Sequence, residues 1–442
     1  MRKQLFSILQ IRTRGRPTAH ATTTELFPRV LLFFCLIKIS QVKAFSLPIY
    51  FDSSNHLHRS LSYHPEQPAR IEACISALQE EYQQRSEIIS LVDVSNKIPN
   101  SNKAYASNAV HQPFSQQELD HARNMLLKIH APELVTGLEQ RCRDSRQRRI
   151  EEGKDPLGFV GWIDDDTFVT TETYDVCLRA TAAWIRAVDY VHTQHCCLSS
   201  TTRSTSSSAA AAAAASSAPT IPTAMALTRP PGHHATASQS NGFCLFNFAA
   251  AAAIHYLDIF ASASGEQQNQ PKISILDWDV HYGQGVADIV SKKYPQSIRY
   301  ASIHQIPAFP YMGTKRGIQN NNILTMPMVA DTTWTCGYQQ YFQDALEFLF
   351  EHDRWEPDLV IVCAGYDALD SDELASVGLN AKDFGKMTRL LQDKIRAQQQ
   401  QQQSNSAARL MLGMEGGYQL SKMAGGGNLQ QAVIETVNAL IE

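Results

Sequence analysis

Short apolar runs and amphipathic stretches alternate along the chain. A continuous apolar run such as Leu359–Cys363 has the length and the β-branched content of a strand that is buried on both faces. In residues 66–82, by contrast, apolar positions recur at steps of three and four, which predicts a helix with one buried face. Strands that alternate with helices predict an α/β protein with a mostly parallel central sheet.

The expected strands, each dominated by aliphatic residues, are Leu47–Asp52, Ala224–Thr228, Lys272–Trp278, Ile298–Ile303, Leu359–Cys363 and Arg409–Met414. The expected helices are 66–82, Met125–Leu138, Tyr174–Val191, Leu245–Ile259, Val286–Lys293, Thr335–Glu351 and Lys382–Arg396. Two low-complexity tracts interrupt this pattern, one rich in Ser, Thr and Ala at about 199–222 and one rich in Gln at about 397–405. Neither has a packing face, so we expect both to be surface insertions in one domain that spans 47–442.

The amino terminus differs from the rest of the chain. Several Arg and Lys residues, with Glu25 as the sole acidic residue among them, precede the apolar run Val30–Ile37. This run is far shorter than the roughly 20 residues that cross a bilayer, so we expect no stable membrane span. The run is followed by Val42-Lys43-Ala44, which is typical of a cleavable signal, and residues 1–46 are interpreted as a targeting presequence.

The Ala44-Phe45 junction resembles the presequences of algae with secondary plastids, which favours a plastid location. An Arg-rich mitochondrial leader is the alternative. If the leader is not functional, the protein would stay in the cytoplasm or nucleus.

The composition of the chain argues against several classes of protein. Apolar residues make up 43% of the chain and charged residues 19%, which suits a globular enzyme with a sizeable core. The net charge is −4 with His neutral, so no basic field favours direct binding of nucleic acid. The nine cysteines are scattered without a C-x-x-C pair, which argues against a disulfide framework and against a cysteine-ligated structural zinc site.

Reactive side chains follow four of the expected strands, at the carboxyl ends where parallel sheets place their active sites. These segments are Arg229–Ala235, Asp277–His281, Ala364–Asp367 and Glu415–Tyr418. Asp277, Asp279 and His281 occupy alternate positions and can face one point. Asp367 can reach that point from a neighbouring strand, and such a group is stable only around a cation. One His and two carboxylates predict a hydrolytic metal site, although D-x-D-x-H alone is also typical of a solvated loop.

Two other segments suggest acid-base chemistry. His233 and His234 lie in a Pro/Gly turn, where paired histidines often cap the turn or bind metal adventitiously. Beside a metal-bound water, however, an imidazole can act as a general base, and Asp277 can orient it. Tyr418 follows two glycines that allow a tight turn, and its hydroxyl can donate to a developing oxyanion.

Together these segments resemble the histone deacetylase and acetylpolyamine amidohydrolase superfamily, in its class II-like branch and closest to plant organellar members. The matching motifs run in the order of that family and are His64–Arg70, Arg229–Ala235, Gly242–Asn247, Asp277–Gly285, Ser302–Gln305, Ala364–Asp367 and Glu415–Tyr418. The resemblance covers about residues 47 to 440. It implies an arginase-like three-layer α/β fold with a mostly parallel central sheet.

The resemblance also implies roles for single residues. The implied ligands of a zinc ion, or of ferrous iron in vivo, are Asp279, His281 and Asp367. The implied catalytic residues, with His234 as the general base, are His233, His234, Tyr418 and Asp277. The implied substrate tunnel is lined by Gly242, Phe243, Phe309 and Leu374. An implied structural potassium site consists of Asp277, Asp279, His281, Ser302 and Ile303, and Arg70 matches the arginine on the acetate-exit side.

Three departures from the pattern of the family stand near these positions. Tyr282 replaces the histidine that usually follows the ligand histidine, so we expect altered packing there. Gln284 stands where class I enzymes carry an aspartate, which leaves His234 without a charged partner and predicts a lowered pKa. The loop Pro310–Gly313 also differs from the usual sequence after the tunnel phenylalanine.

The leading functional prediction is zinc-dependent deacetylation of acetyl-lysine in proteins, histone or non-histone. The first alternative is deacetylation of a small acetylated amine, an acetylpolyamine or an N-acetylarylalkylamine. Leu374 stands at the rim position where polyamine-selective relatives carry an acidic residue, which argues against a dicationic substrate, although Glu373 is adjacent. The second alternative is a non-catalytic repressor scaffold with the same fold. The sequence predicts no oligomeric state.

Overall fold

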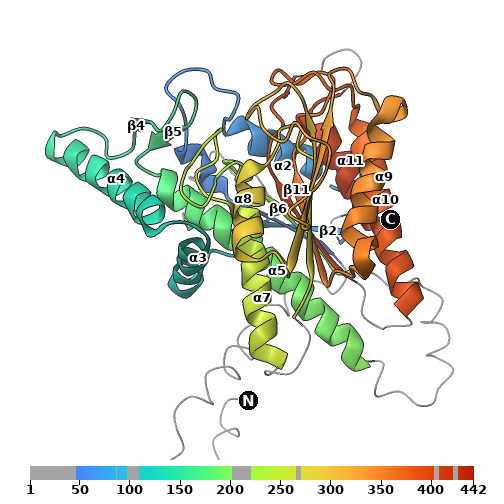
Figure 1. Cartoon of the computed structure of the whole chain (residues 1–442). Coiled ribbons are helices and arrows are strands. Elements are labelled where there is room, and N and C mark those ends of the chain that lie inside the picture. The colour runs from blue at the N-terminus through green and yellow to red at the C-terminus, as the bar shows by residue number, and fades with distance from the viewer. Residues whose placement is uncertain are drawn as a thin grey trace, which may run out of the picture. The chain divides into compact units, whose positions relative to one another are not determined.

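A ten-stranded sheet forms the centre of the domain (Figure 1). The structure is a computed structural model that describes residues 46–85, 87–96, 109–201, 221–264, 270–402, 408–421 and 427–442. The strands of the sheet are β1 Leu47–Phe51, β2 Ile89–Asp93, β3 Val110–His111, β6 Thr223–Leu227, β7 Ile273–Asp277, β8 Ile298–Gln305, β9 Gly317–Gln319, β10 Ile323–Met328, β11 Leu359–Ala364 and β12 Arg409–Met414. Their order is β3-β2-β1-β6-β12-β11-β7-β8-β10-β9, and β9 with β10 is the antiparallel pair. The predicted mostly parallel sheet is therefore confirmed.

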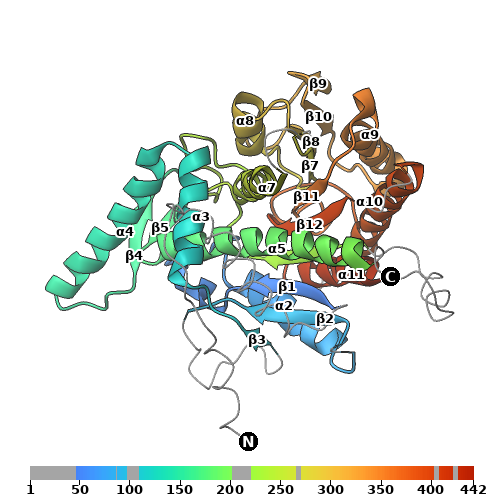
Figure 2. The same cartoon turned by 90° about the horizontal axis from the view of Figure 1, so that it is seen from below.

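Helices cover both faces of this sheet, as the two views together show (Figures 1 and 2). One face packs against α2 Ala69–Glu81, α9 Gln339–Phe350, α10 Ala381–Gln402 and α11 Leu429–Ile441. The other face packs against α5 Thr173–Thr201, α7 Phe248–Ser264 and α8 Gln284–Lys293. Outside α5 and α7 lie α3 Gln116–Ile129 and, next to it, α4 Pro132–Glu151. This is the expected three-layer α/β fold.

The sequence accounts for the burial of the middle layer. The central strands β7, β11 and β12 are buried at every residue, in keeping with their continuous apolar runs. Helix α7 starts with Phe248 and five alanines, Ala249–Ala253, and all six side chains have no exposed area. This segment is apolar on all sides because it lies between the sheet and the neighbouring helices.

Several expected boundaries are wrong. The helix expected at Met125–Leu138 is two helices, because His130 and Ala131 adopt extended backbone and Pro132 starts α4. The start of the helix expected at Thr335–Glu351 is a turn, Trp334–Tyr338, with Gly337 at φ +120°. Some strands were not predicted, because polar residues flank their short apolar segments. They include β2, β10 and the two strands of a small separate sheet, β4 Phe159–Trp162 and β5 Phe168–Thr170.

The two low-complexity tracts border well-defined elements. Helix α5 continues to Thr201 and β6 begins at Thr223, so most of the Ser/Thr/Ala tract lies outside the described residues. Helix α10 continues to Gln402, so the beginning of the Gln-rich tract is helical. The presequence predicted at 1–46 lies, apart from Ser46, outside the described residues.

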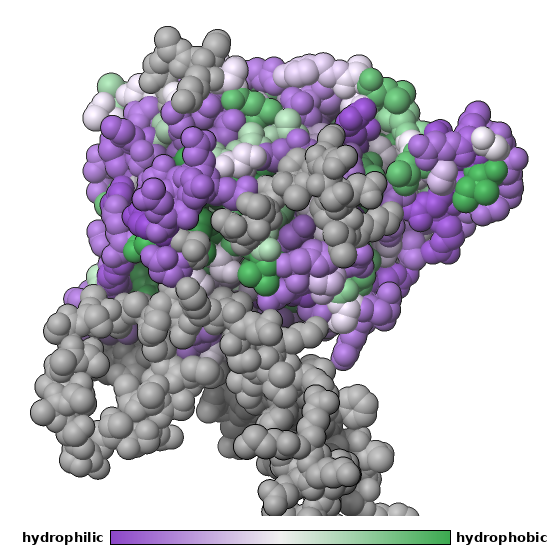
Figure 3. Space-filling view, turned by 180° about the vertical axis from the view of Figure 1, so that it is seen from behind, coloured by the Kyte–Doolittle hydropathy of each residue, from purple (hydrophilic) through white to green (hydrophobic). Residues whose placement is uncertain are grey.

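The face of the molecule drawn in Figure 3 is mostly polar where residues are described. In the view of Figure 3, hydrophilic residues predominate, and hydrophobic ones are scattered in small groups. Among the helices that the structure describes, none has the length and apolarity needed to cross a membrane.

Candidate metal centre and catalytic site

The four reactive segments meet at one edge of the sheet. Strands β6, β12, β11 and β7 are consecutive neighbours and run parallel, so their carboxyl ends lie side by side. The loop after β6 carries the His-His turn (Gly232–His234), and the loop after β7 carries Asp279 and His281. Asp367 follows β11, and Tyr418 follows β12. Tertiary structure thus brings together side chains that are up to 185 positions apart, from His233 to Tyr418.

Asp279, His281 and Asp367 converge on one point. His281 Nδ1 lies 3.3 Å from Asp279 Oδ1 and 3.1 Å from Asp367 Oδ2. One ligand atom of each residue lies within 4.8 Å of the other two. Both carboxylates have no exposed area, and His281 is 8% exposed.

The surroundings fit a divalent cation. Burial lowers the pKa of His281, but its hydrogen bonds to Asp279 and Asp367 outweigh burial and raise that pKa well above its ordinary value. The carboxylates therefore require a positive charge, which a metal ion supplies as well as a proton does. A Cβ on Gly416 would meet both ligand carboxylates, and one on Gly365 would meet Asp279. Only glycine leaves room for these carboxylates at those two positions.

Backbone amides fix the orientation of the two carboxylates. Gly416 N donates to Asp279 Oδ2 at 2.8 Å, and Val280 N donates to Asp367 Oδ1 at 2.9 Å. Each acid therefore keeps its second oxygen directed towards His281. This arrangement is what an ordered metal ligand set needs.

The two histidines of the His-His turn have different partners. His233 Nδ1 lies 3.1 Å from Asp277 Oδ2, whereas His234 Nδ1 lies 2.7 Å from the neutral Gln284 Oε1. Burial lowers the pKa of His233, but Asp279 and Asp277 outweigh it and raise that pKa to about 10. Burial, His233 and His281 all lower the pKa of His234 well below its usual value. The pKa of His234 is lowered, as predicted, but burial and the neighbouring imidazoles are the cause, since the hydrogen bond to Gln284 by itself raises that pKa.

Sequence reasoning missed two residues that support this turn. Tyr300, on β8, donates its hydroxyl to Asp277 Oδ2 at 2.6 Å. Glu415, the last residue before the two glycines, accepts hydrogen bonds through Oε2 from Gly232 N at 2.6 Å and His233 N at 3.1 Å. Glu415 stood inside a matching motif, but nothing in the local pattern indicated which backbone it would contact.

Tyr418 lies between an arginine and an aromatic ring. The guanidinium of Arg70 is 4.6 Å from the centroid of the Tyr418 ring, and the ring of Phe243 meets it edge-on at 5.7 Å. Arg70 is fully buried, and its Nε donates to Gly417 O at 2.7 Å. Arg70 therefore contacts the tyrosine and its backbone directly.

The predicted tunnel residues lie against the catalytic side chains. The ring of Phe309 meets His234 edge-on at 4.8 Å. A Cβ on Gly242 would collide with Phe309 and His234, and the backbone there has φ +52°, so glycine is required. Leu374 is half-buried in the loop after β11. These contacts bring Phe243, Phe309 and Gly242 next to the His-His turn and Tyr418.

The remaining predicted positions lie along β7 and β8. Asp277 and Ser302 are register partners on these adjacent strands, and Ile303 follows Ser302. The ring of Tyr282, at a departure from the pattern of the family, lies with its centroid 4.8 Å from that of His304. In the loop after Phe309, Tyr311 is 73% exposed.

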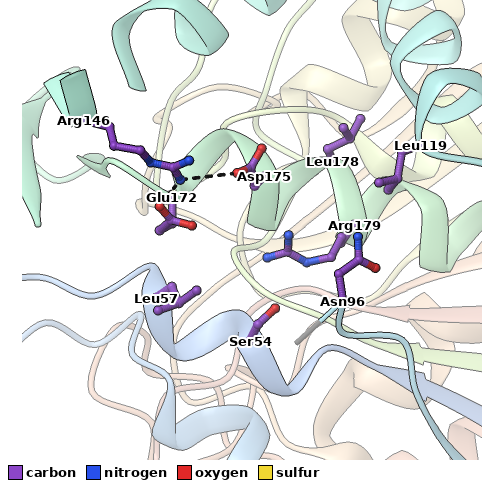
Figure 4. A pocket seen from close by; sticks show the side chains of 9 residues that line it. All are labelled: Ser54, Leu57, Asn96, Leu119, Arg146, Glu172, Asp175, Leu178 and Arg179. Atoms are coloured by element: carbon purple, nitrogen blue, oxygen red, sulfur yellow. Dashed lines mark hydrogen bonds and ion pairs between the residues drawn. The ribbon is translucent and has the colours of Figure 1, made fainter. Parts of the chain in front are cut away.

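A separate cavity of about 270 Å³ lies between η1 (Ser53–Leu57) and the helices α3, α4 and α5 (Figure 4). None of the predicted site residues lines it. Its arginines are already paired, because Arg146 contacts Glu172 and Arg179 Nε donates to Asp52 Oδ2 at 2.8 Å. The cavity thus presents no net positive charge to an anion.

Comparisons with known proteins agree with this geometry. Residues 64–433 match the histone deacetylase domain family. The chain is 32% identical over 283 residues to an uncharacterized protein of Synechocystis sp., which covers 64% of this chain and 74% of that protein. It is 25% identical over 360 residues to "Histone deacetylase 10, chloroplastic" of Oryza sativa subsp. japonica, covering 80% of this chain and 68% of the relative.

A solved structure supports the fold. The crystal structure of the HDA15 HD domain superimposes with a TM-score of 0.62 at 20% sequence identity, covering 90% of this chain and 89% of that one. The family match spans the four reactive segments and most of the sheet that carries them. The chain therefore belongs to the histone deacetylase domain family and is an amidohydrolase.

Proposed function

We propose that the chain is a zinc-dependent deacetylase that hydrolyses N-acetyl amides, with acetyl-lysine in proteins as its substrate. The observation that supports this most is the convergence of Asp279, His281 and Asp367 in a buried site beside the His-His turn. Zinc fits one imidazole and two carboxylates, and ferrous iron is compatible with the same ligands. When bound, the metal supplies a Lewis acid and lowers the pKa of a water molecule.

His234 is the general base of the proposed reaction. Its pKa is lowered by burial, His233 and His281, so the imidazole is neutral near pH 7 and can accept a proton from the attacking water. Gln284 Oε1, 2.7 Å from Nδ1, favours the tautomer with hydrogen on Nδ1 and leaves Nε2 free to accept. The protonated imidazole then returns a proton to the leaving amine.

His233 supplies a positive charge next to the reacting carbonyl. Burial opposes that charge, but Asp279 and Asp277 hold the pKa of His233 at about 10. The imidazolium is therefore an electrostatic stabiliser and is not the base. Tyr300 and Asp277 keep its ring oriented through the hydrogen bonds described above.

Tyr418 is the donor to the carbonyl oxygen. Burial raises the pKa of its hydroxyl well above 10, so the hydroxyl stays protonated and can donate to the oxygen on which negative charge develops. Phe243 and Phe309 line the approach, exclude water from the acetamide and contact an extended alkyl chain such as that of lysine. Arg70 lies on the acetate-exit side of Tyr418.

A small acetylated amine is the second candidate substrate. The observation that favours it is Glu373, whose carboxylate accepts a hydrogen bond from the Tyr63 hydroxyl at 2.5 Å and is thereby held next to Leu374. A fixed carboxylate near the rim can attract a second amino group. The apolar Leu374 favours acetyl-lysine or a monoamine over an acetylpolyamine.

The proposed location is the plastid. The name of the rice relative, chloroplastic, and the signal-type composition of residues 1–46 both support an organelle. A structural potassium ion bound by Asp277, Asp279, His281, Ser302 and Ile303 is also proposed, and the pairing of Asp277 with Ser302 on β7 and β8 supports it.

Acetate release from an acetyl-lysine peptide and from an N-acetylated small amine tests the function. The purified chain is assayed with and without dialysis against a chelator, and its metal content is measured by mass spectrometry. We expect turnover that disappears on chelation and returns with zinc or ferrous iron. A repressor scaffold would release acetate from neither substrate under any of these conditions.

Tyr418→Phe tests the role of the tyrosine. Losing one donor to the developing oxyanion lowers kcat by about 10²–10³-fold. The metal content should not change, because Tyr418 is not a ligand. Tyr294→Phe is the matched control, since that residue follows the carboxyl end of α8, away from the strand ends that carry the site. A variant Tyr418→Phe with wild-type kcat would contradict the proposed role.

A further inference from the structure

The segment that carries Tyr418 has little regular structure of its own. Strand β12 ends at Met414, and Gly416 and Gly417 follow before the tyrosine. Gly417 has φ +112°, a conformation that only glycine adopts easily. Two successive glycines leave the direction of the following residue poorly determined by local preference. An external contact must therefore fix the backbone of Tyr418.

Arg70 binds the carbonyl of Gly417, and Asp372 binds the amide of Tyr418 itself. Asp372 Oδ2 accepts hydrogen bonds from Tyr418 N at 2.7 Å and from Gln419 N at 3.2 Å. Its Oδ1 accepts a hydrogen bond from Leu374 N at 3.0 Å. The side chain thus joins the loop after β12, which carries Tyr418, to the loop after β11, which carries Leu374. Asp372 is 7% exposed.

These contacts need a side chain that presents acceptor oxygens to both loops. Within the part of the chain that the structure describes, Asp372 forms no ion pair with Lys, Arg or His, and backbone amides are its hydrogen-bond donors. Burying an acid without a cation is unfavourable unless hydrogen bonds compensate. Burial and the nearby Asp367 raise the pKa of Asp372 to about 7, whereas the hydrogen bonds from the three amides lower it and so favour the ionised form. A buried acid with this set of partners fixes the backbones of the two loops that it joins.

We propose that Asp372 is a positioning residue that fixes the backbone of Tyr418 and thereby aims its hydroxyl at the carbonyl oxygen of the substrate. The inference rests on the proposed role of Tyr418 as oxyanion donor. Asp372 is five positions past Asp367 and does not belong to the metal ligand set. Asp372 therefore acts on the reaction through the two loops that it joins, and the contact with Tyr418 N is the one that bears on the oxyanion donor.

Replacement of Asp372 should lower kcat and not raise KM. With Asp372→Ala the amide of Tyr418 loses its acceptor and the hydroxyl shifts, which lowers kcat by about tenfold to a hundredfold. Asp372→Asn keeps an amide oxygen for Tyr418 N and loses mainly the bond from Leu374 N, so it should retain kcat within about threefold. If Asp372→Ala does not fold, Asp372→Ser replaces it, since the serine side chain is too short to join the two loops.

A double-mutant cycle separates positioning from general destabilisation. Each variant is made in the wild-type and in the Tyr418→Phe background and assayed on a trifluoroacetyl-lysine peptide, whose electron-poor carbonyl depends less on the hydroxyl. We expect Asp372→Ala to lower kcat in the wild-type background and to change it less than about twofold when Tyr418 is already replaced. An equal loss in both backgrounds would overturn the proposal.

Ser371→Ala is the matched control. Ser371 Oγ donates to Gly427 O at 2.9 Å, so this change removes a neighbouring contact between loops without touching the amide of Tyr418. Ser371→Ala should leave kcat unchanged. A decrease in kcat equal to that of Asp372→Ala would contradict the positioning role of Asp372. A wild-type protein without activity, or a Tyr418→Phe variant with wild-type kcat on the acetyl-lysine peptide, would instead contradict the proposed function.

Discussion

Glu66 is the anion of a buried charge cluster, and its replacement by glutamine is expected to destabilise the domain. Arg229 Nε donates to Glu66 Oε1 at 2.6 Å, and Arg70 Nη1 lies 3.4 Å from the same oxygen. The side chains of all three residues have no exposed area. Glutamine has the same shape without the charge, so both guanidinium groups would lose their counter-ion.

The size of this effect follows from two independent considerations. Burial alone raises the pKa of Glu66, but Arg229, His58 and Arg70 outweigh it and lower that pKa from 4.5 to about 2. Such a difference between the folded and unfolded states corresponds to about 3 kcal/mol. Removing one partner of a buried ion pair costs about 3–5 kcal/mol, because an uncompensated charge remains. By both considerations, Glu66→Gln lowers the free energy of unfolding by about 3 kcal/mol.

Thermal unfolding measures this loss. An unfolding entropy of roughly 2 cal/mol/K per residue over a domain of this length converts it into a midpoint that is lower by about 4 °C. Glu80→Gln, on the exposed side of α2, is the control and should change the midpoint by less than about 1 °C.

The pH dependence gives a second check. Because the pKa of Glu66 is lowered on folding, its stabilisation is fully present above pH 4.5 and is lost as the pH falls towards 2. The difference between wild type and Glu66→Gln must therefore be the same at pH 7 as at pH 5.5. A drop of less than about 1 °C, or a difference that shrinks between these two pH values, would refute the reasoning.

Two further predictions concern stability. Gly413→Ala on β12 places a Cβ inside the buried ring of Trp184 and should lower the free energy of unfolding, measured by urea denaturation, by about 2–3 kcal/mol. The control is Gly137→Ala, whose Cβ meets nothing within 4 Å and which should not destabilise the protein. Burial lowers the pKa of His58 to about 3 and that of His130 to about 4. Because the unfolded state takes up these protons first, the thermal midpoint should fall as the pH drops below 6.5. The midpoint of the His130→Asn variant should fall less steeply with pH than that of the wild type. Parallel curves of midpoint against pH for the two proteins would contradict this prediction.

Local sequence patterns were sufficient to predict the elements whose apolar residues follow a single clear pattern along the chain. Continuous apolar runs predicted β7, β11 and β12, because strands buried on both faces need no polar positions. The break between α3 and α4 was missed, since the apolar periodicity continues across His130 and only Pro132 marks a new start. The Gln-rich tract was assigned to an insertion on composition, although α10 continues into it.

The structure brings together the predicted site residues that follow strands directly. Asp279 and His281 follow β7 directly, and the parallel topology then brings Asp367 to them. Residues that act through backbone contacts were missed. Glu415 accepts from the His-His turn and Asp372 accepts from Tyr418 N, and each contact joins loops from different strands. A sequence pattern cannot specify such pairings, because they depend on strand order.

By itself, the sequence determined the fold class, the ordered motifs and the identity of the three metal-ligand candidates, since these follow from periodicity and from residue chemistry at strand ends. Only the tertiary structure decided the electrostatics of the site. His233 and His234 are adjacent in the chain, yet Asp279 and Asp277 raise the pKa of the first, whereas burial, His233 and His281 lower the pKa of the second. Charge interactions depend on distance and desolvation in space, and neither can be read from neighbouring positions in a sequence.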